Sequence, residues 1–218
     1  MEYLERVKPI VDQTIATLAS ARFVVDPIAG EKYSRLTSII SSAYKRHGTI
    51  LEFALRESLR ESNRHRVWRE DTFRVSRAAD QIIGQQTAEA YNSTMLPYGE
   101  STRTLQIDMM VFDNADQTLR AYEIKRGNGQ FDAGKIRSIK RDLIVTQMLL
   151  KSYGATFNIA AEKAEARIIF YYGRRSIPRP YSLIGSELNE HFGFPVYDLV
   201  EEANLYFKAQ LYDLLNRI

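Results

Sequence analysis

Apolar residues recur every three to four positions in several stretches of the chain, and this spacing predicts amphipathic helices. The first stretch shows the pattern clearly, with Leu4, Val7 and Val11 on one helical face. Gly48 and Gly154 are expected to end the helices that precede them, because glycine commonly terminates helices. The helices predicted in this way cover residues 3–21, 32–44, 50–62, 78–90, 132–153, 183–191 and 201–216.

Alternating or compact apolar runs predict the strands. The expected strands cover residues 67–75, 102–113, 118–126, 167–172 and 195–199. Residues 114–117, with the sequence Asn-Ala-Asp-Gln, are turn-forming and would join the second and third strands into a hairpin. This order of elements predicts an α/β fold in which helices flank a mixed central β-sheet and the N-terminal part is helical.

The length and composition suit a single folded domain. The chain has 218 residues, of which 44% are hydrophobic, so it can bury a substantial core. We expect one domain over residues 1–218, with a helical N-terminal part (1–46), a core (47–175) and a C-terminal α/β extension (176–218). The absence of cysteine excludes disulfides, thiolate nucleophiles and cysteine-ligated zinc. Because the charged N-terminus lacks a signal-peptide core and no apolar run approaches roughly 18 residues, we expect a cytoplasmic protein with no membrane partner.

Positive charge is concentrated in the middle of the chain, although the formal net charge is only +3. Residues 120–151 hold eight basic and three acidic residues, whereas residues 182–218 hold two basic and six acidic ones. Arginine outnumbers lysine 21 to 9, and guanidinium groups suit contacts to phosphates and to guanine. Nucleic acid is therefore a reasonable partner, with an ordinary solvated surface as the alternative.

Two carboxylates face each other across the predicted hairpin. If residues 114–117 form a four-residue loop, Asp113 pairs with Thr118 and Asp108 pairs with Glu123. Directly opposed residues of an antiparallel pair have Cβ atoms roughly 4.5–5.5 Å apart on one face. Lys125 lies two residues beyond Glu123 and therefore on the same face. A loop of odd length would shift the register by one residue and break this alignment.

These three side chains suit the binding of a divalent metal beside a phosphate. Mg²⁺ takes oxygen ligands, usually one or two carboxylates together with waters and phosphate oxygens. In phosphodiester hydrolysis a metal activates water and neutralises charge, and a nearby cation can orient that water. Acids in half-buried strands are costly unless compensated, and a metal with Lys125 would compensate Asp108 and Glu123. We therefore expect Mg²⁺ as the cofactor.

Ile107-Asp108, followed about fifteen residues later by Glu123-Ile124-Lys125 and then by a basic helix, resembles the PD-(D/E)xK nuclease superfamily, which includes type II restriction endonucleases. The resemblance covers roughly residues 49–172, and Ile107 stands where the family has proline. It implies a mixed sheet flanked by helices and an Mg²⁺ ion held by Asp108, Glu123 and the carbonyl of Ile124. It also implies that Lys125 lies beside the attacking water.

Glu52 is a fourth catalytic candidate. Many members of this superfamily carry a glutamate on an earlier helix, and Glu52 resembles it. Because Glu52 adjoins the apolar stripe of Leu51 and Leu55, we expect it at the edge of the core. The alternative is an ordinary surface ion pair with Arg56, one helical turn later.

Basic residues that follow the catalytic strand are the candidate DNA contacts. They are Arg126 at the end of the strand, Lys135, Arg137, Lys140 and Arg141 on the next helix, and Arg174, Arg175 and Arg179 in a proline-containing loop. Such side chains would contact phosphates or, in the loop, read bases. For the helix, an ordinary solvated surface is an equally good interpretation.

The resemblance implies a Mg²⁺-dependent endonuclease that hydrolyses double-stranded DNA, and a type II restriction endonuclease fits best because the chain is small. Such a protein would cut both strands as a symmetric homodimer, and a cognate methyltransferase could be encoded nearby. Two alternatives stay open. One is a repair or recombination nuclease of the same fold, and the other is a DNA-binding module without catalysis.

Overall fold

The chain forms two compact units in a computed structural model that describes residues 3–83, 94–127 and 129–218. The helical unit contains the residues up to Glu61 together with Pro195–Ile218, and the sheet unit contains Ser62–Phe194. The predicted α/β class is confirmed, with a mixed sheet, flanking helices and N-terminal helices. No helix among the described residues is long and apolar enough to cross a membrane.

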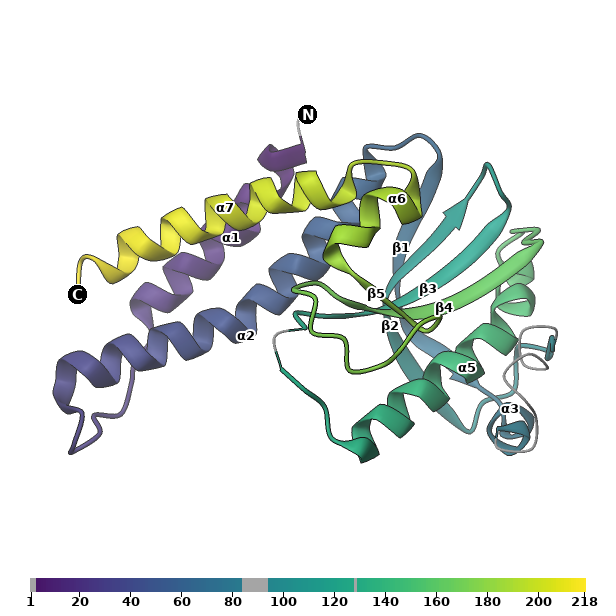
Figure 1. Cartoon of the computed structure of the whole chain (residues 1–218), viewed down its shortest axis with the longest axis horizontal. Coiled ribbons are helices and arrows are strands. Elements are labelled where there is room, and N and C mark those ends of the chain that lie inside the picture. Colours follow the sequence, from purple (N-terminus) through teal and green to yellow (C-terminus); the bar gives the residue numbers. More distant parts are fainter. Residues whose placement is uncertain (1–2, 84–93, 128) are drawn as a thin grey trace. The chain divides into compact units, whose positions relative to one another are not determined.

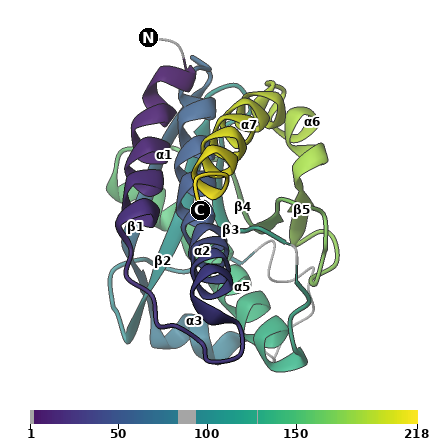
Figure 2. The same cartoon turned by 90° about the vertical axis from the view of Figure 1, so that its left-hand side faces the viewer.

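Three helices make up the helical unit. They are α1 (Tyr3–Ser20), α2 (Gly30–Arg60) and α7 (Val196–Leu215), and they lie side by side (Figure 2). Each helix buries one stripe of its surface, which in α1 includes Val7, Val11 and Leu18. This is the face that the helical spacing of apolar residues predicts. An ion pair between Arg6 Nε and Glu57 Oε2, 2.8 Å apart, links α1 to α2.

Two predictions are wrong in the helical unit. Gly48 does not end a helix, because α2 runs through it without a break. A glycine inside a helix costs only about 1 kcal/mol, and the burial of neighbours such as Ile50 outweighs that cost. Residues 195–199 are not a strand, since α7 begins among them. Their short apolar run fits either structure, and the helix buries both Val196 and Val200.

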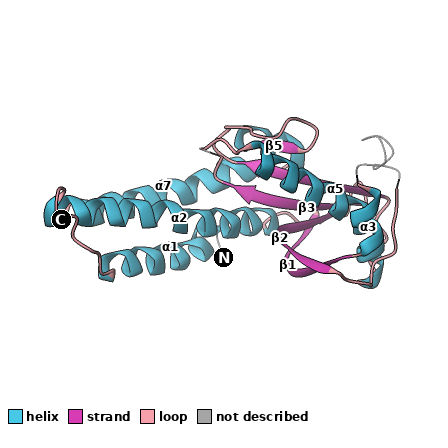
Figure 3. Ribbon diagram, turned by 90° about the horizontal axis from the view of Figure 1, so that it is seen from below, coloured by secondary structure: helices cyan, strands magenta, loops and turns pink. Residues whose placement is uncertain are grey.

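The sheet unit contains a five-stranded mixed sheet with the strand order β1-β2-β3-β4-β5. Figure 3 shows its strands in magenta. Strand β2 is antiparallel to both β1 and β3, whereas β4 is parallel to β3 and β5 is parallel to β4. The bounds are β1 His65–Val75, β2 Arg103–Asp113, β3 Thr118–Lys125, β4 Lys163–Phe170 and β5 Ser182–Ile184.

Helix α5 (Ala133–Thr156) follows β3 along the chain and packs on one face of the sheet (Figure 1). Leu149 of α5 shares a buried core with Met110 and Leu119 of the hairpin. Gly154 lies inside α5 rather than ending it. A Cβ atom at Gly154 would lie 2.9 Å from Cδ2 of Leu119, so the glycine allows the helix to approach the sheet.

Shorter helices complete the sheet unit. The predicted helix 183–191 is replaced by the end of β5, the 3-10 helix η1 (Gly185–Glu187) and α6 (Leu188–Phe192). The run Ser182–Ile184 pairs with β4 because an open strand edge offers backbone hydrogen bonds that a helix would leave unused. Helix α3 (Arg77–Ile82) represents the start of the predicted helix 78–90, whose part from 84 to 90 lies outside the described residues.

Asp113 stabilises the turn of the hairpin through hydrogen bonds, and it is only 1% exposed. Its carboxylate accepts bonds from Arg64 Nε at 2.6 Å and Nη2 at 2.5 Å, and from Arg120 Nη1 at 3.2 Å. It also accepts the backbone N–H of Ala115 at 2.9 Å. Burial opposes ionisation of Asp113, but the bonds from Arg64 and Ala115 outweigh it and lower the pKa to about 2.

Replacing Asp113 should test how strongly this anchor stabilises the sheet unit. We expect Asp113→Asn to lower the free energy of unfolding by roughly 3 kcal/mol, because Arg64 and the buried Arg120 each lose a carboxylate partner. Because the pKa of Asp113 is depressed, its contribution is present above the ordinary aspartate pKa. It is lost as the pH falls toward about 2, and the variant should lack this dependence. Urea denaturation between pH 2 and pH 7 measures both effects.

Asp71→Asn is the matched control for this measurement. Asp71 pairs with Arg69 at 2.8 Å, but its side chain is 67% exposed. Surface pairs contribute at most about 1 kcal/mol, so this variant should unfold almost as the wild type does. Equal losses in the two variants would show that the buried anchor has no special role.

Candidate functional site

The hairpin register agrees with the prediction over residues 109–113, and the pairing ends one residue before the predicted pair of Asp108 and Glu123. Asp113 pairs with Thr118, and the pairing continues to Met109 opposite Tyr122. Beyond this pair, a backbone N–H of β3 bonds to the carboxylate of Asp108 instead of to a backbone carbonyl of β2. This carboxylate accepts the N–H of Ile124 at 2.8 Å. Strand β3 therefore holds the Asp108 side chain through the backbone N–H of Ile124.

The three residues predicted for the hairpin site lie together. Lys125 Nζ is 2.6 Å from Glu123 Oε1 and 3.8 Å from Asp108 Oδ2. The side chain of Asp108 is 6% exposed, whereas those of Glu123 and Lys125 are 30% and 35% exposed. One carboxylate is thus fixed in the interior, while the other carboxylate and the ammonium group reach solvent.

The surroundings act differently on the two carboxylates. Burial is the main cause that raises the pKa of Glu123, Lys125 opposes it, and the negative charge of Asp108 adds to the increase. Asp108 receives a second hydrogen bond, from Gln106 Nε2 at 3.3 Å. Gln106 is two residues before Asp108 on the same strand, so a period of two would have identified it as a neighbour. A bound cation would favour the ionised form of Glu123.

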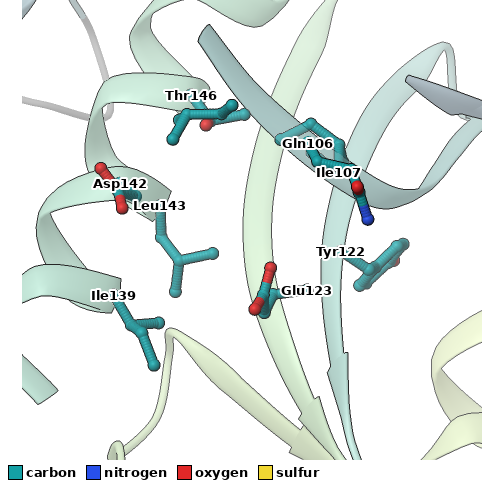
Figure 4. A pocket seen from close by; sticks show the side chains of 10 residues that line it. Gln106, Ile107, Tyr122, Glu123, Ile139, Asp142, Leu143 and Thr146 are labelled. Atoms are coloured by element: carbon teal, nitrogen blue, oxygen red, sulfur yellow. The ribbon is translucent and has the colours of Figure 1, made fainter. Parts of the chain in front are cut away.

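A small cavity adjoins Glu123, between the hairpin and α5. Its volume is about 70 Å³, which is enough to hold ordered water. Figure 4 shows Glu123 from β3, Gln106 from β2, and Asp142 and Thr146 from α5 around it. Asp142 is held by Arg103 Nη2 at 2.8 Å. The sequence pattern did not single out Asp142, because nothing in its spacing relates it to the hairpin.

The donor set at this point fits a hard divalent cation. Among the described residues no three His, Cys, Asp or Glu side chains form a metal-binding group, so the remaining ligands would be a carbonyl, waters and substrate phosphate. Mg²⁺ accepts that combination. In a strand the N–H and C=O of one residue point to the same side, so the Ile124 carbonyl faces the side on which its N–H binds Asp108. The ammonium group of Lys125 near both carboxylates indicates that positive charge is favourable there.

The predicted DNA contacts on α5 all lie at exposed positions, namely Lys135, Arg137, Lys140 and Arg141. Three of them also contact the protein. Lys135 Nζ lies 4.2 Å from the ring centre of Phe131 and Lys140 Nζ 5.2 Å from that of Tyr181. Arg141 Nη2 pairs with Asp80 Oδ1 at 3.1 Å. Arg137 is therefore the position on this helix best suited to a substitution that tests phosphate contacts.

The arginines of the proline-containing loop fall into two groups. Arg175 and Arg179 both pair with Glu187, and these bonds lower the pKa of Glu187 to about 2 even though burial opposes them. One carboxylate thus offsets only part of the charge of the two arginines. Arg174 is exposed, and its backbone N–H donates to Gly127 O at 2.9 Å. The backbone of Arg174 consequently lies next to the residues that directly follow β3.

Gly127 makes this connection sterically possible. Its φ is +70°, and a Cβ atom there would lie 2.8 Å from the backbone carbon of Phe170. Only glycine tolerates both conditions without a shift of the backbone. Gly127 follows shortly after the end of β3, and the next residue, Asn128, lies outside the described residues. The structural reason for glycine at position 127 is a close approach to β4, which a single sequence does not reveal.

Glu52 lies on α2, in the helical unit, at a half-buried position between the buried residues Leu51 and Leu55. The expectation that it stands at the edge of a core is therefore met. Asp108, Glu123 and Lys125 belong to the sheet unit, and a catalytic role for Glu52 stays a prediction.

Comparison with known proteins finds no matching family model, no matching curated protein and no matching solved structure. The assignment of a function consequently rests on the geometry of the hairpin.

A thermal-shift measurement should detect metal binding at the hairpin directly. A ligand at tenfold excess over its Kd stabilises the folded state by roughly 1.4 kcal/mol, which raises Tm by about 3–5 °C in a chain of this size. We expect this increase with Mg²⁺ for the wild type. Glu123→Gln keeps the shape but loses the charge, so its increase should be absent.

Glu165→Gln serves as the control, because Glu165 is a strand carboxylate of similar exposure (32%) that pairs with Arg167. It should keep the full Mg²⁺ response. A Tm that responds equally to Mg²⁺ in both variants would mean that the metal binds elsewhere.

Proposed function

We propose that the protein is a Mg²⁺-dependent endonuclease that hydrolyses phosphodiester bonds of DNA. The observation that carries this proposal is the meeting of Asp108, Glu123 and Lys125 on one hairpin, with Lys125 Nζ within 4 Å of both carboxylates. The resemblance of Asp108 and Glu123-Ile124-Lys125 to the PD-(D/E)xK pattern supports it. The mixed sheet that carries these residues, with α5 against one face, supports it as well.

Each residue of the site has a distinct role in the proposed reaction. When bound, Mg²⁺ activates a water molecule and neutralises charge on the phosphate oxygens. Asp108 and Glu123 supply the anionic ligands, and the backbone N–H of Ile124 keeps Asp108 oriented. Lys125 orients the attacking water and stabilises the negative charge that develops on the phosphate.

Within this class we propose a type II restriction endonuclease that acts on double-stranded DNA as a homodimer, in the cytoplasm and with a cognate methyltransferase. A structural ion-pair cluster in a DNA-binding module is the alternative that the same three side chains allow. Lys125 could then serve only to neutralise the two carboxylates.

Plasmid cleavage tests the proposal. With Mg²⁺ the wild type should convert plasmid DNA to discrete fragments, and Asp108→Ala and Glu123→Ala should each abolish cleavage while remaining folded. Both substitutions remove ligand oxygens without deleting an apolar core group. Fragments that smear or depend on DNA structure would point to a repair nuclease, and binding without cleavage would point to the module. Near-normal activity of either variant would disprove the site assignment.

Lys125 separates catalysis from binding. A group that acts mainly in the transition state lowers the rate of the chemical step and leaves affinity nearly unchanged. We therefore expect Lys125→Ala to reduce single-turnover cleavage by roughly two to four orders of magnitude. DNA affinity in Ca²⁺ should change far less.

Arg137→Ala is the comparison for Lys125→Ala, because Arg137 is exposed on α5 and is a predicted phosphate contact. This variant should bind DNA more weakly and with a smaller salt dependence, but cleave at the normal rate when DNA is saturating. If Lys125→Ala behaves as Arg137→Ala does, Lys125 only binds phosphate.

A further inference from the structure

The segment that follows β4 is attached directly to the end of the catalytic strand. The backbone N–H of Tyr171 donates to Lys125 O at 3.0 Å, and that of Tyr172 donates to Arg126 O at 2.7 Å. The N–H of Arg174 continues the series with its bond to Gly127 O at 2.9 Å. The position of this segment is thus set by the same strand that carries Glu123 and Lys125.

Tyr172 is the exposed aromatic side chain of this segment. It is 46% exposed, whereas the preceding Tyr171 is only 3% exposed and packs against it edge to face, with ring centres 5.4 Å apart. The guanidinium carbon of Arg126 lies 5.4 Å from the centre of the Tyr172 ring. The exposed ring of Tyr172 is therefore held beside Arg126, which directly follows the proposed catalytic residue Lys125.

This combination has a known chemical use. Aromatic rings stack on nucleobases, and adjacent cations bind the phosphates that link those bases. Arg126, whose carbonyl accepts the N–H of Tyr172, supplies positive charge there. The exposed Arg174, two residues after Tyr172, supplies a second positive charge. A single exposed tyrosine needs no explanation, but one whose ring is held beside Arg126 at the end of a proposed nuclease strand suits a nucleotide.

We propose that Tyr172 stacks on an unpaired nucleobase of the DNA next to the phosphate that is cleaved. The inference rests on the proposed function, since the hairpin supplies the reason for DNA to be there. A base inside a duplex is covered on both faces by its neighbours, so a protein ring can stack only on a base that has left the stack or was never paired. The substrate class is therefore DNA with an unpaired nucleotide at the cleavage step, whether extruded from a duplex or present at a flap or gap.

Fluorescence of 2-aminopurine tests the contact without cleavage. The probe is placed as the unpaired nucleotide of a gapped duplex, and the same duplex without a gap is the comparison. In metal-free buffer the wild type should quench the probe and bind the gapped DNA more tightly than the intact one. Tyr172→Ala should abolish the quenching and weaken binding of the gapped DNA by about tenfold, the order that one stacked base contributes. Tyr172→Phe should restore both.

Tyr212→Ala is the matched control, because Tyr212 is also exposed (55%) and also has a cation, Lys208 Nζ, 5.6 Å from its ring centre, but it belongs to α7. This variant should quench and bind as the wild type does. If Tyr172→Ala does so too, the stacking proposal is overturned, although cleavage by the wild type would leave the nuclease proposal standing.

The two proposals can also fail the other way round. Quenching that depends on Tyr172, in a protein that cleaves no DNA with Mg²⁺, would support the stacking contact and overturn the nuclease. A wild type that neither binds nor cleaves any of these DNAs would overturn both. Circular dichroism of each variant shows whether a loss of binding reflects a loss of folding.

Discussion

The buried carboxylate of Asp113 is the constraint on which the geometry of the hairpin depends. Because it is held by Arg64, Arg120 and the N–H of Ala115, the turn has one length, and the pairing of β2 with β3 has one register. A slip by one residue would move every side chain of a strand to the opposite face. Two acids and a lysine on different strands can meet only if that register is kept. The ion pairs of Asp113 at the turn thus help to keep the register that brings Asp108, Glu123 and Lys125 together at the other end of the hairpin.

Much of this arrangement could be predicted from the sequence, because the hairpin is local. A four-residue turn, with Asp113 before it and Asp116 within it, and strands with a period of two are enough to place Asp108 and Glu123 near one another. The helices of the core also follow from their apolar spacing. The predictions failed where local signals conflict with burial. Gly48 lies inside α2, and residues 195–199 include the start of α7. In both places the burial of neighbouring apolar residues stabilises a longer helix by more than the local sequence destabilises it.

Other features depend on contacts between distant parts of the chain, which no spacing within a single sequence reveals. The glycine at position 127 is needed because β4 passes close to it, and Asp142 reaches the cavity beside Glu123 only because α5 folds back over the hairpin. The exposed Tyr172 is separated from Lys125 by a helix and a strand in the sequence. A parallel crossover brings its backbone within hydrogen-bonding distance of Arg126, which directly follows β3.

The ion pair between Lys125 and Glu123 is compatible with metal binding because the members of the site differ in freedom. Asp108 is buried and bound by the backbone, so its position is fixed before any ligand arrives. Glu123 and Lys125 are about one-third exposed, and the ammonium group ends a flexible four-carbon chain. A divalent cation carries twice the charge of the ammonium group and would compete for the same carboxylate oxygens. Lys125 would then be displaced toward solvent, which is the side from which a phosphate would approach in the proposed reaction. Without a metal, Lys125 offsets the cost of burying both acids. The same lysine can therefore stabilise the two carboxylates and still act beside a bound metal in the proposed reaction.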